Sequence, residues 1–331
     1  MTDVLSALST VALYVAMGLY TASFVVFSTD LARRGADATA TVPSVVARRT
    51  AATLPSTALV IGEEPADLPK SSTDAPTRAA RSVLRRAFGL TIAGFAFHFV
   101  ATGLRGIAAA RVPWANMWEF SMTGTLVIIG VFLVANLKWD IKYLGTFIVG
   151  LVLVLQGIAL LRYYVPVVPL QPALQSYWLV IHIIVAVLGT AFFALGFALS
   201  GLQLLQYRRE RQVAESRPQQ FKFLATLPSA VALENLAYRI NIVGFIAWTF
   251  TLIAGAIWAS AAWGRYWGWD TKEVWTFIIW VIYAGYIHAR ATRGWRGSRS
   301  AWLAIIGFAA VLFNFGIVNV FFKGLHTYSG L

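Results

Sequence analysis

Aromatic and charged residues are concentrated between positions 263 and 275, which read WGRYWGWDTKEVW. Four tryptophans and one tyrosine offer flat rings, and Arg265 and Lys272 offer cations. Rings that stack and cations that meet acids suit a planar ligand with carboxylates. The alternative is an aromatic belt at a membrane surface, with the two cations against lipid headgroups. Composition therefore leaves a ligand platform and an interfacial belt as two interpretations of this segment.

Two acids in the same segment have a structural interpretation of their own. Asp270 is followed three positions later by Glu273, and the pattern resembles a capping box that opens the next helix. In that case both carboxylates accept backbone N–H groups at the start of the helix. A direct contact with a ligand is the other possibility.

The chain holds four histidines, His98, His182, His288 and His326. His182 and His326 are predicted near one membrane surface, at a depth similar to that of segment 263–275. Two neutral imidazoles can bind a porphyrin iron from opposite faces. His98 and His288 are predicted deeper, where ionisable groups are costly and usually functional. Their alternative role is a neutral imidazole bonded to a neighbouring helix, or for His288 an interfacial position.

Long apolar helices must position these side chains. Of the 331 residues, 58% are hydrophobic and 12% are charged, against about 25% charged in soluble domains. Apolar runs of roughly 18 to 25 residues are long enough to cross a bilayer as helices. The sequence therefore predicts an all-α integral membrane protein with about eight spans, at roughly 5–27, 87–107, 118–137, 143–162, 177–206, 239–260, 274–292 and 300–322.

Basic residues in the connections predict the orientation. Loop 28–86, rich in Ala, Thr and Ser, is expected to be a flexible cytoplasmic linker. This loop, the one after the third span and segments 207–239 and 290–299 hold 21 of the 27 Lys and Arg residues. The positive-inside rule then places both termini and segment 263–275 on the extracytoplasmic side of the plasma membrane. This bias explains the net charge of +13 better than a nucleic-acid partner does. The absence of cysteine excludes disulfides and thiolate metal sites within the chain.

Segment 263–275 resembles the tryptophan-rich "WWD" signature of the haem-handling proteins of cytochrome c biogenesis. Thr271, where the family commonly has proline, is the one departure from the pattern. The tail from Gly324 to Tyr328 is similar to the family's G-L-H-S-Y element, and segment 177–182 to its upstream histidine motif. Pro113, Asn116 and Glu119 resemble a further element, in which Trp118 replaces tyrosine. The resemblance covers roughly 87–331 and is greatest to the System II members, the CcsA or ResC type (CcsB in actinobacteria).

The resemblance implies roles for the histidines and the loop. His182 and His326 are expected to ligate the iron of an outer haem, and His288 that of a haem within the membrane. His98 is a candidate for the second ligand of that membrane haem. The outer haem is expected to contact the side chains of the loop, namely Trp263, Arg265, Tyr266, Trp267, Trp269, Asp270, Lys272 and Trp275.

The resemblance also implies cargo and partners. Haem b (iron protoporphyrin IX) is expected to be moved outward and presented to apocytochrome c, whose CxxCH thiols add to the haem vinyl groups. A ResB-type membrane protein and a thioredoxin-like thiol reductant are the expected partners. No catalytic base is evident, so the chain is expected to be one component of a holocytochrome c synthase.

Three other classes of membrane protein fit the sequence less well. A transporter of another substrate predicts inverted repeats and acids inside the membrane, and neither is visible. A membrane glycosyl- or acyltransferase predicts a long outward loop with an acidic motif. A respiratory cytochrome b predicts paired histidines on two helices, which four singly placed histidines do not supply.

Overall fold

The computed structural model describes residues 1–40, 78–168, 170–292 and 295–326, and no strand occurs in these ranges. Nine of the helices are α1 (Thr2–Ala40), α3 (Arg78–Ala109), α4 (Met117–Lys138), α5 (Gly145–Arg162), α6 (Tyr177–Ala214), α7 (Ala230–Trp263), α8 (Thr271–Ala291), α9 (Ser298–Phe313) and α10 (Asn319–Phe321). Short 3-10 turns lie at Lys142–Leu144, Pro172–Leu174 and Lys222–Thr226, and a π-helical turn occupies Asn314–Val318. The all-α prediction is confirmed.

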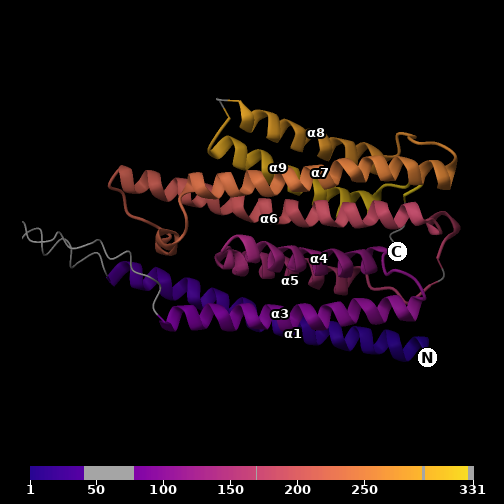
Figure 1. Cartoon of the computed structure of the whole chain (residues 1–331), viewed down its shortest axis with the longest axis horizontal. Helices are drawn as coiled ribbons and strands as arrows, with labels where there is room; N and C mark the ends of the chain where they lie inside the picture. Colours follow the sequence, from indigo (N-terminus) through magenta and orange to yellow (C-terminus); the bar gives the residue numbers. More distant parts are fainter. Residues whose placement is uncertain (41–77, 169, 293–294, 327–331) are drawn as a thin grey trace, which may run out of the picture.

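Seven helices in the described ranges are long and apolar enough to cross a membrane. They correspond to seven of the eight predicted spans, and the chain is a multi-pass membrane protein. The remaining predicted span, 274–292, forms α8, which lies alongside α7 and α9 in Figure 1. Its tryptophans, tyrosines and terminal charges lower its hydropathy, so the eighth crossing remains a prediction.

The boundaries of the first loop need a correction. Helix α1 continues to Ala40, and α3 already begins at Arg78, so the predicted loop 28–86 is helical at both ends. An i,i+4 ion pair between Asp30 and Arg34, with a distance of 2.7 Å, supports the extension of α1. The middle of the predicted linker, residues 41–77, lies outside the described residues.

The helices form three layers with nearly parallel axes (Figure 1). Helices α1 and α3 pack against each other on one side, α4 and α5 lie in the middle, and α6 to α9 form the other side. The start of α1 lies at one end of the bundle, and the described chain returns to this end at Leu325, which contacts Asp270. The α7–α8 connection, which carries segment 263–275, lies at this same end.

Small residues let α6 and α7 approach closely. A side chain on Gly196 would overlap the amide of Asn241, and one on Gly244 would come within 2.8 Å of the Phe193 ring. Close backbone approach through small residues is typical of packed membrane helices. This packing fixes α7 relative to α6, and therefore fixes the wall of the site described next.

Candidate haem site

A cavity of about 420 Å³ opens among α4, α6, α7, α8 and the π-helical turn. Its deeper wall is apolar and includes Ile128, Leu155 and Phe308. Five of the residues expected to bind haem line the cavity: His182, Tyr266, Trp267, Lys272 and His326. The structure therefore brings together two histidines that are 144 positions apart in the chain.

His182 is held from behind by α7. Its Nδ1 lies 2.9 Å from the carbonyl oxygen of Thr251. Because a carbonyl can only accept, Nδ1 must carry the proton, and Nε2 of the neutral ring carries the lone pair. Gly255 makes room for the ring, since a Cβ there would lie 2.8 Å from Cε1. The imidazole is therefore prepared to act as a metal ligand through Nε2.

His326 is held at the mouth of the cavity by the loop. Its Nδ1 lies 3.3 Å from Oδ1 of Asp270, and the two atoms are not aligned as a regular hydrogen bond. The backbone N–H of Leu325 donates to Oδ2 of the same carboxylate at 2.7 Å. A side chain on Gly324 would overlap this carboxylate, so only glycine lets the backbone come this close to Asp270. Asp270 therefore determines where His326 lies.

Asp270 also begins α8, as the capping box predicts. It accepts the backbone N–H of Lys272 at 2.8 Å, and Glu273 completes the reciprocal contact. Burial opposes the charge of Asp270, but the contact with His326 and the backbone hydrogen bonds outweigh it and lower the pKa of this carboxyl to about 2. Its side chain is used by the helix cap and the tail, and it does not line the cavity.

Trp258 packs against both histidines, and no motif in the sequence pointed to it. Its indole lies nearly parallel to the His182 ring at a centroid distance of 5.8 Å. The His326 ring meets the same indole edge-on at 5.4 Å. The two imidazole centroids are thus no more than about 11 Å apart, the sum of these two distances. Trp258 lies inside an apolar run, where one more aromatic residue gives no signal.

The four loop tryptophans have different surroundings. Trp267 lines the cavity. Trp263 packs against the His326 ring at 4.7 Å and Trp275 packs against Phe313 at 4.4 Å, so both support the wall from behind. Trp269 is 75% exposed, is not among the lining residues and meets the Trp267 ring edge-on, with a left-handed backbone φ of +59°. Of the four, Trp267 is the one that lines the cavity, and contact of the four indoles with a ligand stays a prediction.

The two loop cations also differ. Lys272 lines the cavity, and its Nζ donates to the carbonyl of Asn314 in the π-helical turn at 2.9 Å. A turn of π-helix leaves carbonyls without their usual partner, and such turns are frequent at functional sites. Arg265 lies over Gly268, where a Cβ would overlap its guanidinium, and its NH1 is 3.9 Å from Glu273. Lys272, rather than Arg265, is the loop cation in the cavity wall.

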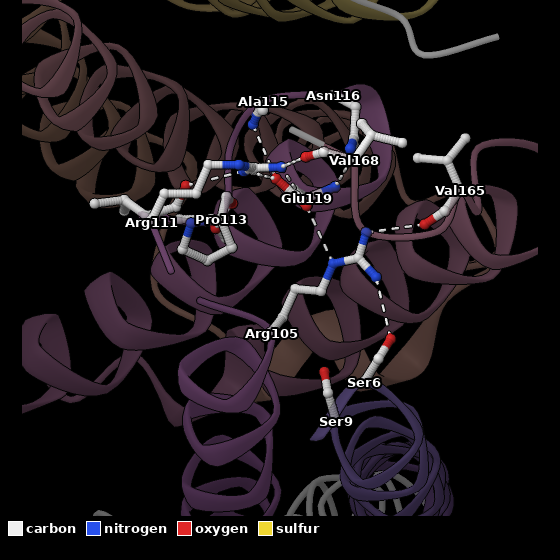
Figure 2. Close-up of polar contacts among 12 residues, drawn as sticks. Ser6, Ser9, Arg105, Arg111, Pro113, Ala115, Asn116, Glu119, Val165 and Val168 are labelled. Atoms are coloured by element: carbon white, nitrogen blue, oxygen red, sulfur yellow. Dashed lines mark hydrogen bonds and ion pairs between the residues drawn. The ribbon is translucent and has the colours of Figure 1, made fainter. Parts of the chain in front are cut away.

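A buried ion-pair network lies beside the cavity (Figure 2). The carboxylate of Glu119, at the start of α4, receives Nε of Arg105 at 3.1 Å and both terminal nitrogens of Arg111. The Glu119 backbone N–H donates to Oδ1 of Asn116, the N-cap residue, at 2.9 Å. The motif residues Asn116 and Glu119 thus lie together, and Asn116 lines the cavity.

The same two arginines connect segments that are distant in sequence. Arg105 also donates to the carbonyl of Val165 at 2.9 Å and lies 3.4 Å from Oγ of Ser6 in α1. Arg111 donates to the carbonyl of Val168 at 3.3 Å. Figure 2 shows both guanidiniums converging on Glu119 from different sides. The network therefore joins α1, α3 and the α5–α6 connection to the wall of the cavity.

The two remaining histidines lie apart from the cavity. His98 on α3 is fully buried, with its Nδ1 3.4 Å from the hydroxyl of Tyr20. His288 on α8 is exposed, and its imidazole has no hydrogen bond to another described residue. Figure 1 places α3 and α8 on opposite sides of the bundle. The structure does not bring His98 and His288 together as a ligand pair within this chain.

Comparisons with known proteins identify the family of the chain. A sequence model of the family described as "Cytochrome C assembly protein" matches residues 114–326. The protein named "Cytochrome c biogenesis protein CcsA" of Heterosigma akashiwo is 34% identical over 248 residues, which cover 66% of this chain and 77% of the relative. The protein of the same name in Guillardia theta is 32% identical over 264 residues, which cover 76% and 88%.

A solved structure has the same fold. The chain named "Cytochrome c Heme Lyase CcmF" matches with a TM-score of 0.60 at 15% identity, over 94% of this chain and 46% of that chain. This chain thus spans about half the length of that protein, and the likeness shows the fold alone. The resemblance to the CcsA type is confirmed by the sequence relatives. The chain belongs to the family of cytochrome c assembly proteins and has a role in cytochrome c biogenesis.

Proposed function

We propose that the chain delivers haem b and presents it to apocytochrome c for thioether attachment. One observation carries the proposal: two imidazoles line a single cavity, and each has its Nδ1 turned to an oxygen atom. Each Nε2 is then available for iron, as in haem sites with two histidine ligands. The relatives named CcsA and CcmF support a haem cargo through their printed roles in cytochrome c biogenesis and as a haem lyase.

The surroundings suit an amphiphilic porphyrin. Trp258 and Trp267 offer flat surfaces for the ring, and the apolar deeper wall suits its hydrocarbon substituents. Lys272 lies in the wall, and its Nζ has no carboxylate within 4 Å among the described residues, so it is the proposed partner of a haem propionate. The chain's task is to bind and orient haem, while the acceptor supplies the thiols.

The orientation and the partners belong to the same proposal. The start of α1 and the α7–α8 connection, which contributes Tyr266 and Trp267 to the cavity, share one end of the bundle, and we assign this end to the extracytoplasmic face of the plasma membrane. A ResB-type membrane protein and a thioredoxin-like reductant are the proposed partners. His288 is exposed on α8, which fits a haem whose second ligand comes from another chain.

A visible spectrum tests the outer site directly. The purified protein in detergent is expected to show the split α and β bands of low-spin haem with two histidine ligands. The His182→Ala/His326→Ala double variant should lose this signal, and added imidazole should restore part of it. A double variant that keeps the full spectrum would overturn the assignment of both ligands.

The proposed orientation has an independent test. Because the chain has no cysteine, single cysteines introduced at Lys323 and Ser216 are unique labels. A membrane-impermeant maleimide added to intact cells should label the cysteine at 323 and leave the one at 216 unmodified. The opposite labelling pattern would reverse the topology.

A further inference from the structure

The Nδ1 atoms of the two cavity histidines lie against different kinds of oxygen atom. Nδ1 of His182 meets the neutral carbonyl oxygen of Thr251 at 2.9 Å. Nδ1 of His326 meets the carboxylate of Asp270 at 3.3 Å. A group behind a ligating imidazole sets its orientation and its basicity, and a carboxylate raises the basicity more than a neutral carbonyl does. The two ligands of the proposed haem are therefore not equivalent.

The carboxylate of Asp270 is held firmly in place. Its Oδ1 accepts the N–H of Lys272 at 2.8 Å and its Oδ2 accepts the N–H of Leu325 at 2.7 Å. These bonds fasten the carboxyl-terminal segment to the first turn of α8. The contacts of Asp270 should make His326 the harder of the two ligands to displace, because they hold both the backbone next to His326 and its ring.

We propose that Asp270 is a positioning residue that makes His326 the retained axial ligand, and that His182 is the ligand that leaves. The inference rests on the proposed haem site and extends it. Attachment brings in the histidine of the acceptor's CxxCH segment, which must replace one protein imidazole on the iron. The Fe–N bond to His182 breaks and the bond to the incoming imidazole forms, so the iron stays six-coordinate with no change of oxidation state. Thr251 keeps its contact with the departed ring.

Haem retention in single-ligand variants tests this order. His182→Gly and His326→Gly proteins are purified in detergent, and the haem-to-protein ratio is measured by pyridine haemochrome. We expect His182→Gly to retain several-fold more haem than His326→Gly, because its remaining ligand is the one backed by the carboxylate. The opposite ranking would overturn the proposal.

A variant of Asp270 separates its effect on His326 from a general effect on the loop. Asp270→Asn is isosteric, and its one oxygen can still accept the Lys272 N–H that caps α8, while the Leu325 N–H beside His326 loses its acceptor. In the His182→Gly background this substitution should lower haem retention several-fold, and in the His326→Gly background it should add no further loss. Equal losses in both backgrounds would indicate a purely structural role and would overturn the proposal. Asp140→Asn, which changes an 82% exposed side chain distant from the cavity, is the matched control and should change neither background.

The midpoint potential of the haem distinguishes the proposal from a purely structural role of Asp270. A structural role predicts no particular direction of change in the potential. With both histidines present, Asp270→Asn should raise the potential, because a less basic His326 stabilises ferric iron less well. An unchanged or lowered potential would contradict the proposal. The proposed function fails separately, and visibly, if the unmodified protein itself shows no haem spectrum with two histidine ligands.

Discussion

The guanidinium of Arg105 on α3 lies 3.1 Å from the carboxylate of Glu119 on α4, and both side chains are almost completely buried. Glu119 also pairs with Arg111, so one carboxylate balances two cations. We predict that Glu119→Gln lowers the free energy of unfolding by about 3–5 kcal/mol, because it leaves two buried guanidiniums without an anion. Thermal unfolding of the purified protein in detergent measures the loss.

The control for this prediction is Glu215→Gln, which removes a surface carboxylate from pairs with Arg211 and Arg217. Exposed ion pairs contribute about 0–1 kcal/mol, so this variant should unfold close to the unmodified protein. Equal losses of stability in the two variants would show that the buried network does not stabilise the bundle.

Gly255 should be intolerant of alanine for a local reason. Its added Cβ would lie 2.8 Å from Cε1 of His182, so the ring must move off the Thr251 carbonyl. We expect Gly255→Ala to lower haem retention at least several-fold and to broaden the split α and β bands. Gly201→Ala on α6, whose Cβ meets no atom within 4 Å, is the matched control and should retain haem normally. Normal retention in Gly255→Ala would remove His182 from the site.

Two neighbouring tryptophans should respond differently to the same change. Trp267 lines the cavity, whereas Trp269 is exposed and does not. We predict that Trp267→Leu lowers the haem-to-protein ratio several-fold and shifts the Soret band, and that Trp269→Leu leaves both unchanged. Similar effects in both variants would mean that the whole loop, rather than the one indole, contacts the cargo.

Replacing each of the two histidines outside the cavity should change the stability of the protein by different amounts. His98 is fully buried between α1 and α3, so His98→Ala should cost about 2–3 kcal/mol through the cavity that it leaves. His288 is exposed, so His288→Ala should change the stability of the isolated chain by less than about 0.5 kcal/mol. Unfolding curves measure both changes. Under the proposed function, any haem ligated by His288 should appear only when a membrane partner is present.

Much of the architecture followed from the sequence alone. Bilayer thickness and the need to satisfy backbone hydrogen bonds make long apolar runs into helices, so seven of the predicted spans match described helices. The capping box at Asp270 and Glu273 is likewise a local pattern, because its partners are three residues apart. Helix ends were less predictable, since the polar ends of α1 and α3 continue the helix where hydropathy alone suggests a loop.

The site required the tertiary structure, because its contacts join positions far apart in the chain. The sequence named His182, His326, Asp270 and Lys272, but it could not show that the Thr251 carbonyl lies behind one imidazole and the Asp270 carboxylate behind the other. Nor could it find Trp258, which is one more aromatic residue within an apolar helix until packing brings it against both rings. Residue types determined which groups were available for iron chemistry. Helix packing decided which of them meet, because a hydrogen bond or a metal ligand depends on a few ångströms that sequence separation does not encode.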